Sequence, residues 1–316
     1  MIVIAGGTGF LGRPLAERLA ADGHAVTVLT RTTTSGTSGH NSSRPAGSSI
    51  GYLEWQPDGT TGPWSRAIDG AGAVVNLAGE SIAARWTTTH KTRILESRLN
   101  ATKSLVAAIT AARQPPPLFV SASAVGYYGD RGEEVLTEQS APGRDFLADV
   151  CVQWEREAMR ADSPRTRVAA VRSGMALDPS GGALAKMLPP FKMFVGGPLG
   201  SGRQFMSWIH RSDWVALVRW IITNATVGGV VNATAPEPVT NATFAKTLGR
   251  ALHRPSLLPA PAFALRMLVG EMADGMLLAS QRAMPACAET LGFPFSYPRL
   301  ELALDSLFTR PTPATG

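Results

Sequence analysis

The sequence predicts an α/β protein with a doubly wound, parallel sheet and a smaller, mostly helical C-terminal domain. Short apolar and β-branched segments alternate with segments of helical periodicity over residues 1–175, the pattern of parallel strands joined by crossover helices. From about residue 255 the pattern is mostly helical. The chain has 316 residues, 44% of them hydrophobic and 17% charged, so it is long enough for one large domain with an appended one.

Strands are expected where apolar runs are short, and helices where apolar residues recur with helical spacing. The expected strands lie at residues 1–5, 25–30, 51–55, 73–77, 118–121, 167–172 and 229–232. The expected helices lie at residues 14–20, 87–112, 145–161, 213–223 and 240–252, the last capped by Thr240. Residues 181–202 are expected to be rich in loops, because they contain paired glycines, paired prolines and a glycine-rich segment.

A glycine-rich turn over residues 6–12 separates the first strand from the first helix. A strand, a glycine turn and a helix in this order predict a dinucleotide site, with the pyrophosphate at the start of the helix. Gly6 allows the tight turn, Gly9 lets the pyrophosphate approach, and Gly12 lets the helix pack close to the strand. The alternative is a merely structural turn. The expected cofactor contacts in this turn are Gly6, Thr8, Gly9, Phe10, Leu11 and Gly12.

The end of the second strand predicts which cofactor binds. In dinucleotide folds an acidic residue there holds the 2′-hydroxyl of NAD, whereas an arginine accommodates the 2′-phosphate of NADP. This strand ends Leu29-Thr30-Arg31, without an Asp or Glu nearby. A guanidinium forms a paired, charge-assisted contact with phosphate, so we predict NADP(H). The alternative is a solvated arginine at a strand end.

Two further strand ends carry small residues that let a cofactor lie against the backbone. The fourth strand closes with residues 76–80 and the next with residues 121–123. Ligands of open α/β sheets bind at the carboxyl ends of the strands, and both segments fall at that level. Further cofactor contacts are therefore expected from Leu77, Ala78, Gly79, Ser121 and Ala122.

Composition argues against several other classes of function. The net charge is +6 and the pI about 9.7, but the charge is scattered without a Lys/Arg run, so no nucleic-acid partner is expected. No apolar stretch has the length of a membrane span and no signal segment begins the chain, so we expect a cytoplasmic protein without a membrane partner. No Cys/His cluster has metal-ligand spacing. Residues 32–49 are expected to form a mobile Ser-, Gly- and Thr-rich loop.

Four segments, taken together with the Gly6-x-x-Gly9-x-x-Gly12 spacing, resemble the extended short-chain dehydrogenases/reductases. Within them the closer resemblance is to an atypical, epimerase-like branch with a specific C-terminal helical domain. The segments are 76–80, 121–129, 196–210, and Gln281-Arg282 with Gly292-Phe293. We accordingly divide the chain into an NADP-binding Rossmann domain (1–175 and about 205–234), a substrate domain (about 176–204 and 235–306) and a tail (307–316).

The resemblance implies a catalytic Ser, a Tyr and a Lys four residues after the Tyr, and this chain departs from that pattern. Counted back from Glu155, the Tyr and Lys positions fall on Leu147 and Cys151, which cannot transfer protons as that mechanism requires. The candidate catalytic residues are therefore Ser123, Tyr127, Tyr128 and Glu80. The alternatives are that one tyrosine packs under the nicotinamide and the other in the core, and that Glu80 is a helix-cap or salt-bridge residue.

The segment 200–210 is the expected substrate face. Its glycines let backbone approach a ligand, Arg203 and His210 could hold an anionic group, Gln204 a polar one, and Trp208 offers a flat wall. The alternative for His210 is a structural histidine bonded to Asp213 or to backbone.

Two functional hypotheses follow. The first is an NADP(H)-dependent oxidoreductase or epimerase acting on a small polar, anionic or sugar-nucleotide substrate. The second is a non-catalytic NADP(H) sensor that acts on a protein partner, which the loss of the Tyr–Lys pair favours. Relatives of the resembled branch carry labels of nucleoside-diphosphate-sugar epimerase or of cell-division inhibitor. A homo-oligomer is compatible with either hypothesis.

Overall fold

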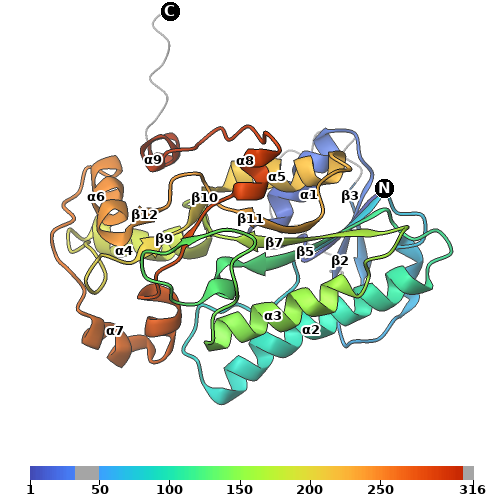
Figure 1. The fold of residues 1–316 in the computed structure, drawn as a ribbon, viewed down its shortest axis with the longest axis horizontal. Coiled ribbons are helices and arrows are strands. Elements are labelled where there is room, and N and C mark those ends of the chain that lie inside the picture. Colours follow the sequence, from blue (N-terminus) through green and yellow to red (C-terminus); the bar gives the residue numbers. More distant parts are fainter. Residues whose placement is uncertain (33–49, 309–316) are drawn as a thin grey trace, which may run out of the picture.

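The largest element of the fold is a seven-stranded parallel sheet (Figure 1). The structure is a computed structural model that describes residues 1–32 and 50–308. The strand order is β11-β7-β5-β4-β1-β2-β3. The chain therefore builds the sheet outward from β1, first to one side and then to the other, as in a doubly wound Rossmann sheet. The predicted fold class is therefore confirmed. The strands are β1 (Ile2–Ala5), β2 (Val26–Thr30), β3 (Ile50–Glu54), β4 (Ala73–Asn76), β5 (Leu118–Ala124), β7 (Arg167–Ser173) and β11 (Gly229–Ala233).

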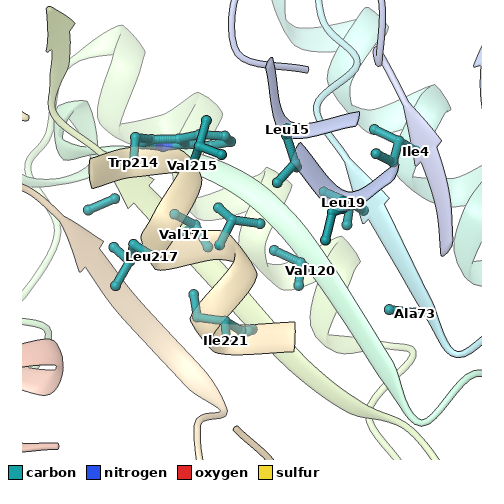
Figure 2. Close-up of a cluster of buried hydrophobic side chains, with 14 of the residues drawn as sticks. Ile4, Leu15, Leu19, Ala73, Val120, Val171, Trp214, Val215, Leu217 and Ile221 are labelled. Carbon is teal, nitrogen blue, oxygen red and sulfur yellow. The ribbon is translucent and has the colours of Figure 1, made fainter. Parts of the chain in front are cut away.

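Helices cover both faces of this sheet (Figure 1). On one face lie α1 (Gly12–Ala21) and α5 (Arg211–Thr223), and on the other α2 (Thr88–Ala111) and α3 (Phe146–Met159). Strands that are covered on both faces have nearly continuous apolar sequences. This is why the strands could be located from the sequence. Figure 2 shows the first layer, where side chains of α1 and α5 pack on the strands; the labelled examples are Leu15, Leu19, Trp214, Leu217, Ile221, Ile4, Val120 and Val171.

Capping side chains mark the starts of several helices. The side chains of Thr87, Asp145 and Thr240 accept hydrogen bonds from backbone N–H groups in the first turns of α2, α3 and α6 (Asn241–Ala251). The predicted cap at Thr240 is thus confirmed. Helix α2 ends at Ala111, shortly before the run of prolines at 115–117.

The smaller elements lie outside the sheet, most of them at the left of Figure 1. They are the strands β6 (Val135–Leu136), β8 (Met175–Leu177), β9 (Phe205–Met206), β10 (Trp208–His210), β12 (Val239–Thr240) and β13 (Arg282–Ala283), and the helices α4 (Gly182–Lys192), α7 (Ala262–Val269), α8 (Ala286–Thr290) and α9 (Leu300–Phe308). Those among them that flank α4, α6 and α9 share a separate apolar cluster that includes Leu184, Phe191, Trp208, Phe244 and Leu304. Single-turn 3-10 helices lie at Pro63–Ala67 and Val125–Tyr128, and a π-helical turn at Ala273–Leu277.

One expected loop is a helix. The structure places α4 over residues 182–192, where paired prolines led us to expect irregular backbone. The prolines remove two N–H donors near the C-terminal end of α4, but Leu184, Leu188 and Phe191 share a buried side of the helix. Tertiary packing therefore outweighs local propensity here. The loop expected at 32–49 lies, from residue 33 onward, outside the described residues, as does the end of the chain from residue 309.

Candidate functional site

The glycine turn between β1 and α1 packs so tightly against neighbouring backbone that Gly6 and Gly12 have no room for a side chain. Gly6 has φ +77°, and a Cβ added there would lie 2.7 Å from the carbonyl carbon of Leu77. A Cβ on Gly12 would collide with the carbonyl oxygen of Gly6 and lie 2.7 Å from Cα of Gly7. Gly6 thus lets the turn pass against the end of β4, and Gly12 lets α1 start against the turn.

The start of α1 fits an anionic group. No side chain caps its first N–H groups, and its first turn contains no acidic residue. Arg13 donates its N–H to the carbonyl of Gly9 and Pro14 has no N–H, so the N–H groups of residues 10–12, together with the positive end of the helix dipole, are the ones placed to meet a phosphate. The residues at the turn therefore fit a dinucleotide pyrophosphate.

The other residues of the turn have different surroundings. Thr8 is exposed. Leu11 is partly buried against the apolar cluster that α1 and α5 form with the sheet. The ring of Phe10 leaves no room for side chains at Gly181 and Gly182, where an added Cβ would lie 2.6 and 2.9 Å from it. Phe10 therefore ties the glycine turn to the loop that precedes α4.

At the end of β2, Arg31 is exposed. The strand register places Glu54, at the end of β3, directly opposite Thr30. A carboxylate therefore lies one strand away from the end of β2, which the sequence did not reveal because residues 31–49 separate the two strands. Arg13, exposed in the first turn of α1, is a further cation that sequence reasoning missed.

A buried amide holds the end of β4 in place. Asn76 Nδ2 donates to Thr102 Oγ1 (3.0 Å), and Asn76 Oδ1 accepts from the backbone N–H of Ala78 (3.2 Å). The N–H of Leu77 donates to the carbonyl of Ala5 at the end of β1 (2.9 Å). Leu77 and Ala78 thus lie beside the glycine turn, and the cofactor contacts expected from residues 77–79 stay a prediction.

Glu80 follows directly, on the surface of the molecule. Its backbone N–H donates to Ser97 Oγ (2.9 Å), and its carboxylate lies 3.8 Å from the Arg93 guanidinium. The salt-bridge alternative for Glu80 therefore has a partner, while its proposed acid–base role stays a prediction.

A buried polar network lies beneath the end of β5. The Arg172 guanidinium donates to both oxygens of Glu155 (2.8 Å each), and Ser123 Oγ donates to the same carboxylate (2.6 Å). Arg172 also donates to the hydroxyl of Tyr128 (3.0 Å), which in turn donates to Asn232 Oδ1 (2.7 Å). Burial lowers the pKa of Arg172, but Glu155 outweighs this effect and raises it overall.

Two catalytic candidates therefore have structural roles. Tyr128 is fully buried, and burial raises the pKa of its phenol. Its hydroxyl is engaged by Asn232 and Arg172, so Tyr128 is not placed to donate a proton to a ligand. Ser123 is 4% exposed, and its hydroxyl bonds Glu155. Both assignments from sequence are corrected for the same reason, because these side chains belong to the core beneath the site.

Tyr127 has the opposite environment. It is half-buried, and the Arg172 guanidinium lies 3.3 Å from its ring centroid. It meets Tyr128 edge-on, with ring centroids 5.4 Å apart. Of the two tyrosines, Tyr127 is thus the one that retains access to a ligand at the end of β5. Ser121 is buried and its hydroxyl bonds the backbone of Ala122.

Replacing each tyrosine by phenylalanine separates these roles. Tyr128→Phe leaves Asn232 Oδ1 and an Arg172 N–H group without a partner in the core, so we expect a loss of about 1–3 kcal/mol in unfolding free energy. Tyr127→Phe keeps the ring over Arg172, and we expect a change within about 0.5 kcal/mol. Urea denaturation of both variants measures the difference. Equal losses would contradict the assignment.

The positions of the missing Tyr–Lys pair are filled by apolar packing. Leu147 packs against Gly126, where an added Cβ would lie 3.3 Å away. Cys151 is buried, and burial, with the charge of Glu155, raises the pKa of its thiol to about 11. The thiol is therefore neutral at pH 7 and supplies neither a proton acceptor nor a cation.

Three residues of the expected substrate face also lie inside the protein. Trp208 is fully buried and donates its indole N–H to the backbone carbonyl of Glu237. Its ring therefore offers no flat wall to a ligand. Gln204 Nε2 donates to the carbonyls of Leu199 and Leu277, which joins two backbone segments. These sequence assignments are corrected.

His210 caps a helix, and Arg203 alone of the four keeps an open position. His210 Nδ1 accepts from the N–H of Ser212 at the start of α5 (3.2 Å), and burial lowers the pKa of its ring, which therefore favours the neutral form at pH 7. The structural alternative thus fits His210. Arg203 is exposed and remains available to an anionic ligand.

Residues 1–32 and 50–308 contain no helix that is both long and apolar enough to cross a membrane. Within the same ranges, no cluster of three or more His, Cys, Asp or Glu side chains could hold a metal ion.

The sheet order, the glycine turn and its uncapped helix start define an NAD(P)-binding Rossmann protein. The family model described as the NAD dependent epimerase/dehydratase family matches residues 2–234. The chain belongs to this family. A domain of unknown function, DUF1731, matches residues 260–307.

Similar proteins extend the match over the whole chain. The chain is 42% identical over 308 residues to the chloroplastic epimerase family protein SDR39U1 homolog of Arabidopsis thaliana, which covers 97% of this chain and 86% of that protein. It is 38% identical over 307 residues to the epimerase family protein YfhF of Bacillus subtilis, with 97% of each chain covered.

A solved structure, human epimerase family protein SDR39U1 (isoform 2) with NADPH, has a TM-score of 0.86 and 35% identity, and covers 97% of this chain and 98% of that chain. The structure called nucleoside-diphosphate sugar epimerase from Corynebacterium glutamicum has a TM-score of 0.75 and 35% identity, and covers 97% of this chain but 58% of that longer chain.

Proposed function

We propose that this protein is an NADP(H)-dependent oxidoreductase or epimerase that acts on a small polar substrate. The observation that carries the proposal is the uncapped start of α1 beside the glycine turn, combined with Arg31 at the end of β2. The similar human protein was solved with NADPH, which supports the same choice of cofactor.

Three residues have defined tasks in this proposal. NADPH would supply a hydride from its nicotinamide. Tyr127, half-buried just after β5, is the candidate proton donor, and the Arg172 guanidinium packs against its ring and holds it in place. Glu80, half-buried in the turn that follows β4, is a second candidate acid or base.

The second candidate function is a non-catalytic NADP(H) sensor. The observation that favours it is the neutral, buried pair Leu147 and Cys151 at the positions of the usual Tyr and Lys. The two functions differ in turnover. A screen of carbonyl compounds and sugar nucleotides, followed through the absorbance of the reduced nicotinamide and through product stereochemistry, is expected to find a substrate whose conversion Tyr127→Phe slows at least tenfold. Binding of NADPH without conversion of any compound supports the sensor.

Arg31→Ala tests the choice of cofactor. Loss of one charge-assisted contact with the 2′-phosphate is expected to weaken NADPH binding by about tenfold and to leave NADH binding unchanged. The ratio of the two dissociation constants is the measurement. Arg113→Ala is the matched control. Arg113 is also exposed, but it precedes the start of β5 and so lies at the opposite ends of the strands from the expected cofactor site. An unchanged ratio in Arg31→Ala would remove Arg31 from the site.

A further inference from the structure

A half-buried cation that the proposed mechanism does not use lies beside the end of β4. Arg98, in α2, donates through Nη1 to the carbonyls of Glu80 (3.0 Å) and Ile94 (2.9 Å). A Cβ added at Gly79 would lie 3.2 Å from its Cζ, and on the other side its guanidinium lies 5.1 Å from the ring centroid of Trp154 in α3. The guanidinium therefore sits between the turn after β4 and helix α3.

Arg98 has unbonded N–H donors and, among the described residues, no direct ion pair, although the charge of Glu80 acts on it at longer range. Across the part of the chain that the structure describes, no carboxylate lies within ion-pair distance of it. The two bonds of Nη1 use two of its five N–H donors, and the remaining three, on Nε and Nη2, make no hydrogen bond to a described residue. Burial lowers the pKa of Arg98, yet a guanidinium stays charged at neutral pH. The guanidinium is only partly buried and its unbonded N–H groups are accessible, so they can bind an anionic or strongly polar ligand.

The position of Arg98 matters because Cys151 of α3 lies near it. The thiol of Cys151 is close enough for an electrostatic interaction with Arg98. Position 151 is where the resemblance to short-chain dehydrogenases/reductases places the lysine, and here it holds a neutral side chain. The site thus keeps one positive charge, but the charge comes from α2 and not from α3.

We propose that Arg98 is a cofactor-positioning residue, whose free N–H groups bind ribose oxygens of NADP(H) across the end of β4 in place of the missing lysine. The inference rests on the proposed NADP(H) function. The small residues 77–79 leave the backbone open to the ribose at this edge of the sheet, and the contact between Gly79 and the guanidinium puts Arg98 directly behind them. Only one cation fits, because charges at both 98 and 151 would repel each other.

A double-mutant cycle tests the inference. We expect Arg98→Met to weaken NADPH and NADH binding equally, by about tenfold or more, since ribose oxygens are common to both cofactors. Cys151→Lys alone is expected to lower the melting temperature through repulsion with Arg98. The double variant Arg98→Met/Cys151→Lys is expected to regain most of the lost affinity. Fluorescence titration measures binding, and thermal unfolding shows which variants are folded.

The rescue separates positioning from a purely structural role. Loss of the bonds to Glu80 and Ile94 alone could loosen the turn, but a lysine at 151 would not restore those bonds. A folded double variant that binds no better than Arg98→Met, or wild-type binding in Arg98→Met, overturns the inference. If the double variant does not fold, Arg98→Lys is the variant to measure. The inference predicts that Arg98→Lys retains its affinity for NADPH. An affinity as low as that of Arg98→Met would contradict the inference. Failure of the wild-type protein to bind NADPH would instead refute the proposed function.

Discussion

Gly12→Ala is expected to abolish NADP(H) binding and to lower the unfolding free energy by about 3 kcal/mol. The new methyl group would collide with the carbonyl oxygen of Gly6 and lie 2.7 Å from Cα of Gly7. Both obstacles are backbone atoms, which cannot move aside as the end of a flexible side chain can. Relief requires α1 to shift away from β1, and that shift moves the helix start that would hold the pyrophosphate. Urea denaturation and NADPH titration measure the two effects.

Gly51→Ala is the matched control. Gly51 lies in the edge strand β3, and an added Cβ would meet its nearest atom, the carbonyl oxygen of Val26, at 3.9 Å. We expect wild-type binding of NADPH and a change in stability within about 0.5 kcal/mol. Gly12→Ala protein that binds NADPH as tightly as the control would show that the helix start does not hold the cofactor.

Arg172→Met is expected to be the most destabilising change outside the glycine turn, at about 3–5 kcal/mol. Arg172 is 2% exposed and Glu155 is 8% exposed. Removal of the guanidinium leaves the Glu155 carboxylate buried without its counter-ion, and it also frees the hydroxyl of Tyr128. Equilibrium urea unfolding measures the loss.

The double variant Arg172→Met/Glu155→Leu removes both charges together. We expect it to be more stable than Arg172→Met alone, because no unpaired charge remains in the core. Arg160→Ala, which breaks the surface pair between Arg160 and Glu157, is the control and is expected to cost no more than about 1 kcal/mol. If Arg172→Met costs no more than that control, the network beneath β5 does not stabilise the fold.

The sheet could be predicted from the sequence because its strands are buried on both faces. Residues 2–5, 73–75 and 168–171 are buried, so each appears as an uninterrupted apolar run. Helix α4 could not be predicted, since Pro189 and Pro190 hide a helix that depends on tertiary packing. Boundaries also shifted, and β5 continues to Ala124, three residues beyond its expected end.

The candidate site could be predicted only where local sequence determines geometry. Gly6 and Gly12 are needed by the turn itself, whatever else surrounds it. The buried network joins residues far apart in the chain, such as Tyr128 and Asn232, and no local pattern shows which of two adjacent tyrosines points inward. One signal was present, namely an arginine near the end of an apolar strand at Arg172, because such a charge needs a buried partner.

The most direct test of the central claim is a fluorescence titration of the wild-type protein with NADPH and with NADH. The account predicts saturable binding of NADPH that is at least tenfold tighter than that of NADH, because the start of α1 receives the pyrophosphate and Arg31 the 2′-phosphate. Equal affinity for the two cofactors would contradict the assignment to Arg31. Absence of binding by both would contradict the NADP(H) site itself and would leave the glycine turn with a role in folding alone.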